Sequence, residues 1–142
     1  MKPLMMQLVL FALGLVTVGF GVGHAQIMNQ LDFKMSQPFT VANTTFEAGS
    51  YVIRPVEGDS MVLEIVSANG HPGVMVDAFS AQPDSTQPGS HLVFNKYANV
   101  LALSEVFPSA GNAGYQLAQG HPEEVAAKTE KPTKQVEPLN SK

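Results

Sequence analysis

The chain contains no cysteine and no tryptophan, and only 14% of its 142 residues are charged. Without cysteine it can form no disulfide, no thiolate metal site and no thiol nucleophile, and it offers no cysteine for lipid attachment. Its stability must therefore come from packing. The net charge of −4 at pH 7 argues against a nucleic-acid-binding protein, because such proteins normally present a basic face. We therefore expect no nucleic-acid partner.

Charge is also scarce in the N-terminal segment. Lys2 is followed by the uncharged apolar run Leu8–Val22. Gly23-His24-Ala25 then places small residues at the two positions that signal peptidase recognises. This pattern predicts a signal peptide over residues 1–25 and export to the periplasm or the cell exterior. The alternative is a retained membrane anchor, although the run is close to the lower limit of ~17 residues for a spanning helix. We expect contact with a membrane only if this segment is retained.

Removal of residues 1–25 leaves 117 residues, with seven of the eight basic residues and all twelve acidic ones, for a net charge of −5. The last part of this chain, Gln119–Lys142, contains four Lys, four Glu, three Pro and no aromatic residue. Such a composition buries too little apolar surface to offset the loss of chain entropy. A short helix from Pro122 to Lys128 would be marginal alone. The sequence therefore predicts a β-domain over residues 26–118 and a flexible, disordered charged tail over residues 119–142.

Apolar residues in the predicted domain recur mostly with a period of two, which is typical of half-buried strands. Turn signals separate these runs, and Asn69-Gly70 is the strongest signal for a hairpin. We expect an all-β fold, a small antiparallel sandwich or barrel of about six to eight strands. The clearest strand candidates are residues 39–41, 51–54, 61–66, 74–79, 92–95 and 101–103.

The alternation also predicts which side chains face the core. Met61, Leu63 and Ile65 fall on one face of their strand, and Val74, Val76 and Ala78 fall on one face of theirs. Met75 and Phe79 lie on the opposite face, where we expect a packed second sheet to cover them. The alternative is an exposed patch that binds a partner.

Two stretches resemble an uncharacterised family of small exported bacterial β-domain proteins. The first stretch runs from Phe39 to Arg54 and contains Ala48-Gly49-Ser50-Tyr51, which is similar to an AG-x-Y turn. The second, Leu92-Val93-Phe94-Asn95-Lys96-Tyr97, is similar to an LVF-x-K-Y strand. The chain departs from the pattern at Phe46-Glu47, where Leu-Pro is expected, and at Ala98-Asn99, where the pattern favours a glycine-containing turn. The resemblance covers residues 38–118 and implies a fold but no activity.

Candidate catalytic and metal-binding residues are few. No two histidines have a metal-binding spacing, and no serine lies in a G-x-S-x-G or S-x-x-K motif. Folding could still bring His71 and His91 together with Asp77 and Glu105. We therefore expect no catalytic, cofactor-binding or metal-binding residue and no cofactor. The alternative is a small hydrolase or metal-dependent enzyme that uses His71 and His91 with nearby carboxylates.

The resulting hypothesis is an exported, non-enzymatic β-domain that binds a protein or another partner in the bacterial cell envelope. A membrane-tethered structural protein with a retained N-terminal helix is the remaining alternative.

Overall fold

A computed structural model describes residues 30–70, 72–82, 86–109 and 113–139. Within these residues the protein is an all-β domain with one short helix, as the sequence predicts, but it has ten strands instead of six to eight. The elements are β1 (Leu31–Met35), β2 (Phe39–Val41), β3 (Thr44–Phe46), β4 (Gly49–Val56), β5 (Asp59–Ser67), β6 (Val74–Ala81), β7 (His91–Lys96), β8 (Leu101–Phe107), β9 (Gly114–Leu117), α1 (His121–Ala127) and β10 (Thr133–Pro138).

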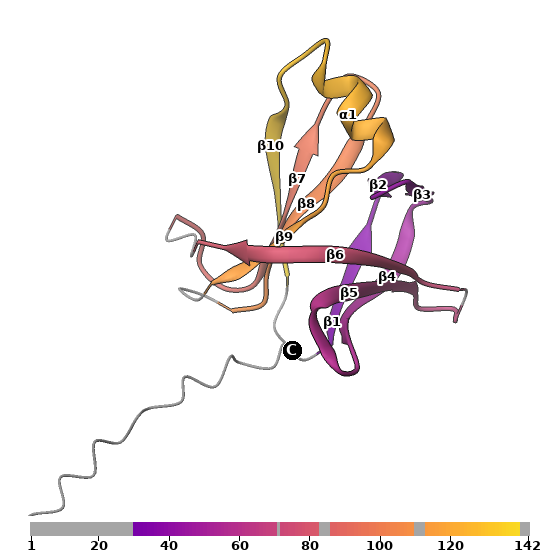
Figure 1. Cartoon of the computed structure of the whole chain (residues 1–142), viewed down its shortest axis with the longest axis vertical. Helices are drawn as coiled ribbons and strands as arrows, with labels where there is room; N and C mark the ends of the chain where they lie inside the picture. Colours follow the sequence, from indigo (N-terminus) through magenta and orange to yellow (C-terminus); the bar gives the residue numbers. More distant parts are fainter. Residues whose placement is uncertain (1–29, 71, 83–85, 110–112, 140–142) are drawn as a thin grey trace, which may run out of the picture.

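Strand β6 belongs to two sheets and connects them (Figure 1). Its first half pairs with β5, which continues through β4 to β1 and forms the first sheet. Its second half pairs with β9, which leads to β8 and the second sheet. All these pairs are antiparallel, so each sheet can present one face to the core between them.

The second sheet is completed on both sides of β8. One edge of β8 pairs with β7, which in turn pairs with β10. The other edge pairs with β9 and, in parallel through Ala102 and Thr40, with β2, whose hairpin partner is β3. Among the described strands, this arrangement leaves β1, β3 and β10 with a single neighbour each.

The core lies between the two sheets and is built around Phe39. The Phe39 ring contacts the rings of Phe46, Tyr51 and Phe94, with centroids 5.2, 5.0 and 6.0 Å apart. Such aromatic pairs add to the stabilisation from burial. Both stretches that carry the family resemblance contribute here, because Tyr51 and Phe94 are buried. The predicted inward positions Leu63 and Ile65 are confirmed, since both are fully buried, whereas Met61 on the same face is exposed near the start of β5.

The hairpin predicted at Asn69-Gly70 is confirmed as the connection between β5 and β6. The Gly70 N–H donates a hydrogen bond of 2.9 Å to the Ser67 carbonyl. Gly70 has φ +80°, a left-handed conformation that glycine adopts without steric cost. Asn69 is not in that region, so only one of the two residues uses a positive φ.

The prediction of a flexible tail is wrong for residues 119–139. Residues His121–Ala127 form α1, with Pro122 in its first turn, and Thr133–Pro138 form β10. The register of β10 with β7 runs from Thr133 opposite Lys96 to Pro138 opposite His91. Hydrogen bonding to the β7 edge thus orders a segment whose side chains are mostly polar.

The predicted signal peptide and its cleavage site lie outside the described residues. Within the part of the chain that the structure describes, no helix is long and apolar enough to cross a membrane.

Candidate functional site

The outer face of β6 carries two large apolar side chains. Val76 and Ala78 are buried, and because side chains alternate along a strand, Met75, Asp77 and Phe79 point to the opposite side. Met75 is 63% exposed and Phe79 is 56% exposed. These values are high for apolar side chains of this size in the middle of a sheet.

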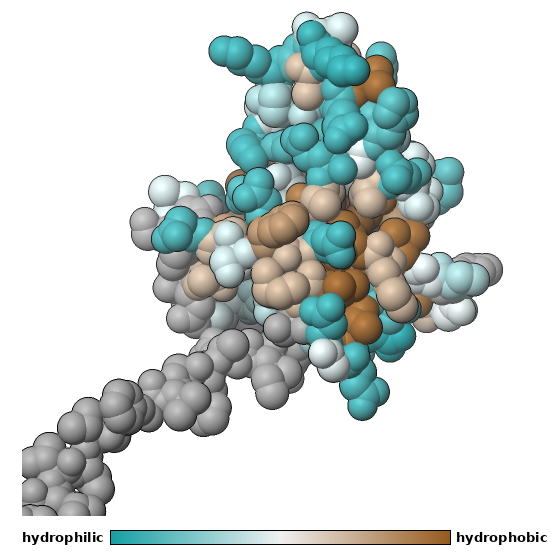
Figure 2. Space-filling view, viewed as in Figure 1, coloured by the Kyte–Doolittle hydropathy of each residue, from teal (hydrophilic) through white to brown (hydrophobic). Residues whose placement is uncertain are grey.

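Valine side chains extend the apolar surface onto the neighbouring strands. Val62 lies opposite Asp77 across the β5–β6 ladder, and Val52 lies opposite Val66 across the β4–β5 ladder. All three valines are half-buried. Figure 2 shows apolar residues gathered over β5 and β6, whereas α1 and β10 above them are mostly polar. We call this surface the β6 face; it consists of Val52, Arg54, Val62, Glu64, Val66, Met75, Asp77 and Phe79.

The expectation that a second sheet covers Met75 and Phe79 is wrong. The second sheet branches from the end of β6 through β9 and packs on the inner side, where it meets Val76 and Ala78. One packed sheet buries only one face of its partner. The outer face therefore stays exposed with its apolar residues.

One ion pair lies within the β6 face, because Glu64 is opposite Met75 across the β5–β6 ladder and stands between Val62 and Val66 on β5. The Arg54 Nε atom lies 2.8 Å from Glu64 Oε2, across the β4–β5 ladder. Together with Val52 and Val66, this pair lines a shallow depression that continues along the β5–β6 loop. The apolar surface is thus interrupted next to Met75 by one charge-balanced pair.

Three residues of the alternative enzyme hypothesis, His91, Asp77 and Glu105, lie within the described part of the chain and are not grouped in one site. His91 is 2% exposed, its ring stacks on Phe107 with centroids 4.7 Å apart, and its Nδ1 lies 3.0 Å from the Gly89 carbonyl oxygen. Asp77 points outward from β6, and Glu105 faces Lys134 at 3.9 Å. His71 lies outside the described residues. Across the described part of the chain, no three His, Asp or Glu side chains are grouped closely enough to hold a metal ion.

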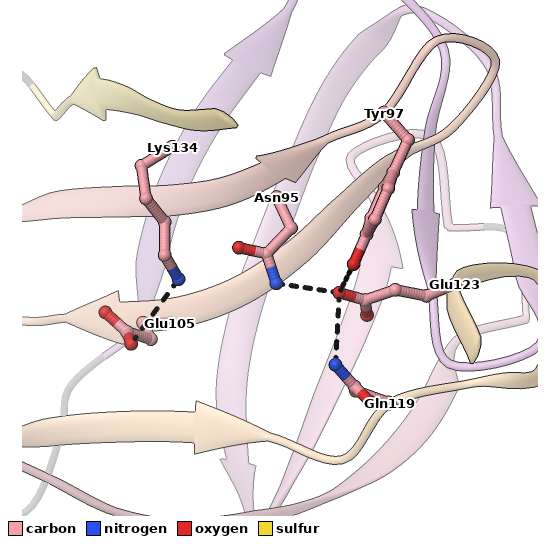
Figure 3. A network of polar contacts seen from close by, with 6 residues as sticks. All are labelled: Asn95, Tyr97, Glu105, Gln119, Glu123 and Lys134. Carbon is pink, nitrogen blue, oxygen red and sulfur yellow. Dashed lines mark hydrogen bonds and ion pairs between the residues drawn. The ribbon is translucent and has the colours of Figure 1, made fainter. Parts of the chain in front are cut away.

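A second polar cluster, which the sequence did not reveal, lies under α1. Glu123 is only 3% exposed, and its Oε1 accepts hydrogen bonds from Asn95 Nδ2 at 2.7 Å, Tyr97 Oη at 3.2 Å and Gln119 Nε2 at 3.5 Å. Figure 3 shows these three side chains pointing at the same carboxylate. Burial raises the pKa of Tyr97, and the charge and hydrogen bond of Glu123 and the charge of Glu130 raise it further.

Backbone contacts fix the position of α1 above this cluster. The Asn43 side chain accepts a hydrogen bond of 2.8 Å from the His121 N–H at the start of the helix. Gly120 lies so close to Ala42 that an added Cβ would be 1.8 Å from the Ala42 carbonyl oxygen. Beyond the helix, Glu130 accepts a hydrogen bond of 2.8 Å from the Ala98 N–H. Together with the Glu123 cluster, these contacts hold the C-terminal segment against the rest of the domain.

No protein-family model, curated protein or solved structure matches the chain. The β6 face is therefore the candidate site on structural grounds alone, because it combines exposed apolar side chains with a carboxylate, Asp77, that has no ion-pair partner among the described residues.

Proposed function

We propose that the protein is an exported, non-enzymatic β-domain that binds a partner protein through the β6 face, in the periplasm or outside the cell. The observation that carries the proposal is the exposure of Met75 and Phe79 on the same side of one strand. Contiguous apolar patches on soluble proteins commonly mark interaction sites. The N-terminal pattern of residues 1–25 supports export.

The arrangement of titratable side chains supports binding over catalysis. Catalysis by His91 with Asp77 or Glu105 would require these groups to share a pocket with a substrate. His91 is instead packed against Phe107 in the interior, and Asp77 faces outward between apolar side chains. Buried carboxylate Glu123 is already engaged by three donors.

Site-specific photocrosslinking in the source cells tests the proposal. A benzophenone amino acid replaces Phe79 in one variant and Val125, an exposed apolar residue of α1, in the matched control. We expect a discrete crosslinked product from position 79 and none from position 125. An excess of purified wild-type protein should compete with this product, whereas the Met75→Lys protein should compete poorly.

Two outcomes would overturn the proposal. One is the same products from both positions. The other is equal competition by the wild-type and Met75→Lys proteins. Since Met75 is exposed, its substitution should change the free energy of unfolding by no more than about 0.5 kcal/mol, so a folded competitor is available.

A further inference from the structure

The centre of the β6 face is a carboxylate with apolar neighbours on both sides. Met75, Asp77 and Phe79 occupy alternate positions of β6, so consecutive members of this row are about 7 Å apart. Asp77 is exposed, and none of the described residues forms an ion pair or a side-chain hydrogen bond with it. Two other acidic residues on the outer side have cationic neighbours, since Glu64 pairs with Arg54 and Glu105 lies near Lys134.

This unpaired carboxylate restricts what can cover the face. A partner that packs on Met75 and Phe79 also removes water from Asp77, and burial of an unpaired charge is strongly unfavourable. A partner that supplies a positive charge between two apolar groups offsets this cost. The net charge of −5 on residues 26–142 favours the same kind of partner.

The geometry points to a cationic amphipathic helix. The face of a sheet offers side chains and no free backbone groups, and a helix satisfies its own backbone hydrogen bonds before it docks. Residues at i, i+4 and i+8 of a helix are spaced by about 6 Å, close to the spacing of the β6 row. We propose that the β6 face binds such a helix, with apolar side chains on Met75 and Phe79 and a Lys or Arg paired with Asp77.

The same charge argues against an anionic membrane as the occupant. Anionic head groups attract basic segments and repel acidic ones. Asp77 would have to approach these head groups together with Met75 and Phe79, because all three share one face. The proposal names the partner of the function proposed above and rests on it.

A peptide-binding experiment tests the charge requirement. The probe is a fluorescently labelled amphipathic peptide of Leu and Lys, titrated with the chain 26–142 and followed by anisotropy. Asp77→Asn should weaken binding roughly fivefold, which corresponds to a surface ion pair of about 1 kcal/mol. Asp77→Lys should weaken binding further. Glu57→Gln is the matched control, because it changes the net charge equally in the β4–β5 turn and should leave the affinity unchanged.

The remaining variants and probes distinguish the proposed cationic helix from the proposed binding function. If Met75→Ser and Phe79→Ser weaken binding but Asp77→Asn and Glu57→Gln behave alike, the requirement for a cation is wrong and the binding function survives. If none of the β6-face variants weakens binding, this peptide-docking proposal is wrong, and the crosslinking experiment decides the binding function. If phosphatidylglycerol vesicles bind the wild-type chain, and bind Asp77→Asn more tightly, a membrane is the occupant and the inference is overturned.

Discussion

At the scale of single residues, Glu123 is a buried carboxylate with several hydrogen-bond donors around it. Its carboxylate accepts three hydrogen bonds at a site that is 3% exposed. Glu123→Ala would leave the Asn95 amide and the Tyr97 hydroxyl without their acceptor in the interior. Unpaired buried donors cost about 1–3 kcal/mol each, so we expect the free energy of unfolding to fall by about 2–6 kcal/mol. Urea denaturation measures this loss.

Glu124→Ala is the matched control for that experiment. Glu124 neighbours Glu123 in the first turn of α1 but is exposed, so its removal should cost no more than about 0.5 kcal/mol. Equal effects of the two substitutions would show that Glu123 contributes through helix propensity and the helix dipole, and not through the buried cluster.

Tyr97 gives the same cluster a pH dependence. Its pKa is raised above the ordinary value of 10.0, first by burial and then by Glu123, so the fold stabilises the neutral phenol. That stabilisation is fully present below pH 10 and is lost as the pH rises through the raised pKa. We expect the free energy of unfolding to fall above pH 10, and to fall less steeply in Tyr97→Phe. A residual slope is expected because burial also raises the pKa of Tyr51.

Urea denaturation across this pH range, together with the ultraviolet absorbance of tyrosinate, checks the prediction. The absorbance shows when tyrosines ionise, and tryptophan does not interfere because the chain has none. A slope that is unchanged in Tyr97→Phe would contradict the assigned cause.

Among the elements, the C-terminal segment is a part of the domain and not an appendage. β10 pairs with β7 along six residues, and α1 supplies the buried Glu123. Deletion of residues 119–142 should therefore lower the thermal midpoint strongly and expose the β7 edge, which promotes aggregation. Truncation after residue 139 is the control. Thermal unfolding followed by circular dichroism, with light scattering for aggregation, distinguishes this expectation from a dispensable tail.

The strands and the C-terminal segment differ in how visible they are in the sequence. Leu63 and Ile65 alternate with less buried residues, so the period of two revealed both the strand and its inward face. The buried side chain of α1 is a glutamate, and β10 is held by main-chain hydrogen bonds to β7. Neither feature produces an apolar pattern. Composition alone therefore indicated a solvated tail.

The same limit applies to the candidate site. The alternation predicted that Met75 and Phe79 lie on one side of their strand and Val76 and Ala78 on the other, and the structure confirms this. Which side is covered depends on where the second sheet branches from the first. That point is set by the pairing of β6 with β9, between residues far apart in the sequence. A local pattern contains no information about such a pairing.

For the whole molecule, the predicted cleavage between Ala25 and Gln26 is compatible with the fold. The first strand begins at Leu31, so removal of residues 1–25 leaves every described strand intact. We expect mass spectrometry of the protein from the envelope fraction to find Gln26, free or cyclised, at the N-terminus. If the protein in that fraction still begins at Met1, the membrane-tethered alternative is favoured.

Mutation of the cleavage site separates processing from folding. Ala25→Leu places a large side chain where signal peptidase requires a small one, so the precursor should accumulate in the membrane fraction. Because residue 25 precedes β1, the uncleaved protein should still fold, and limited proteolysis should give the same resistant core in both forms. If the Ala25→Leu protein is released from the membrane efficiently and has the mass of the processed wild-type protein, cleavage after residue 25 is contradicted.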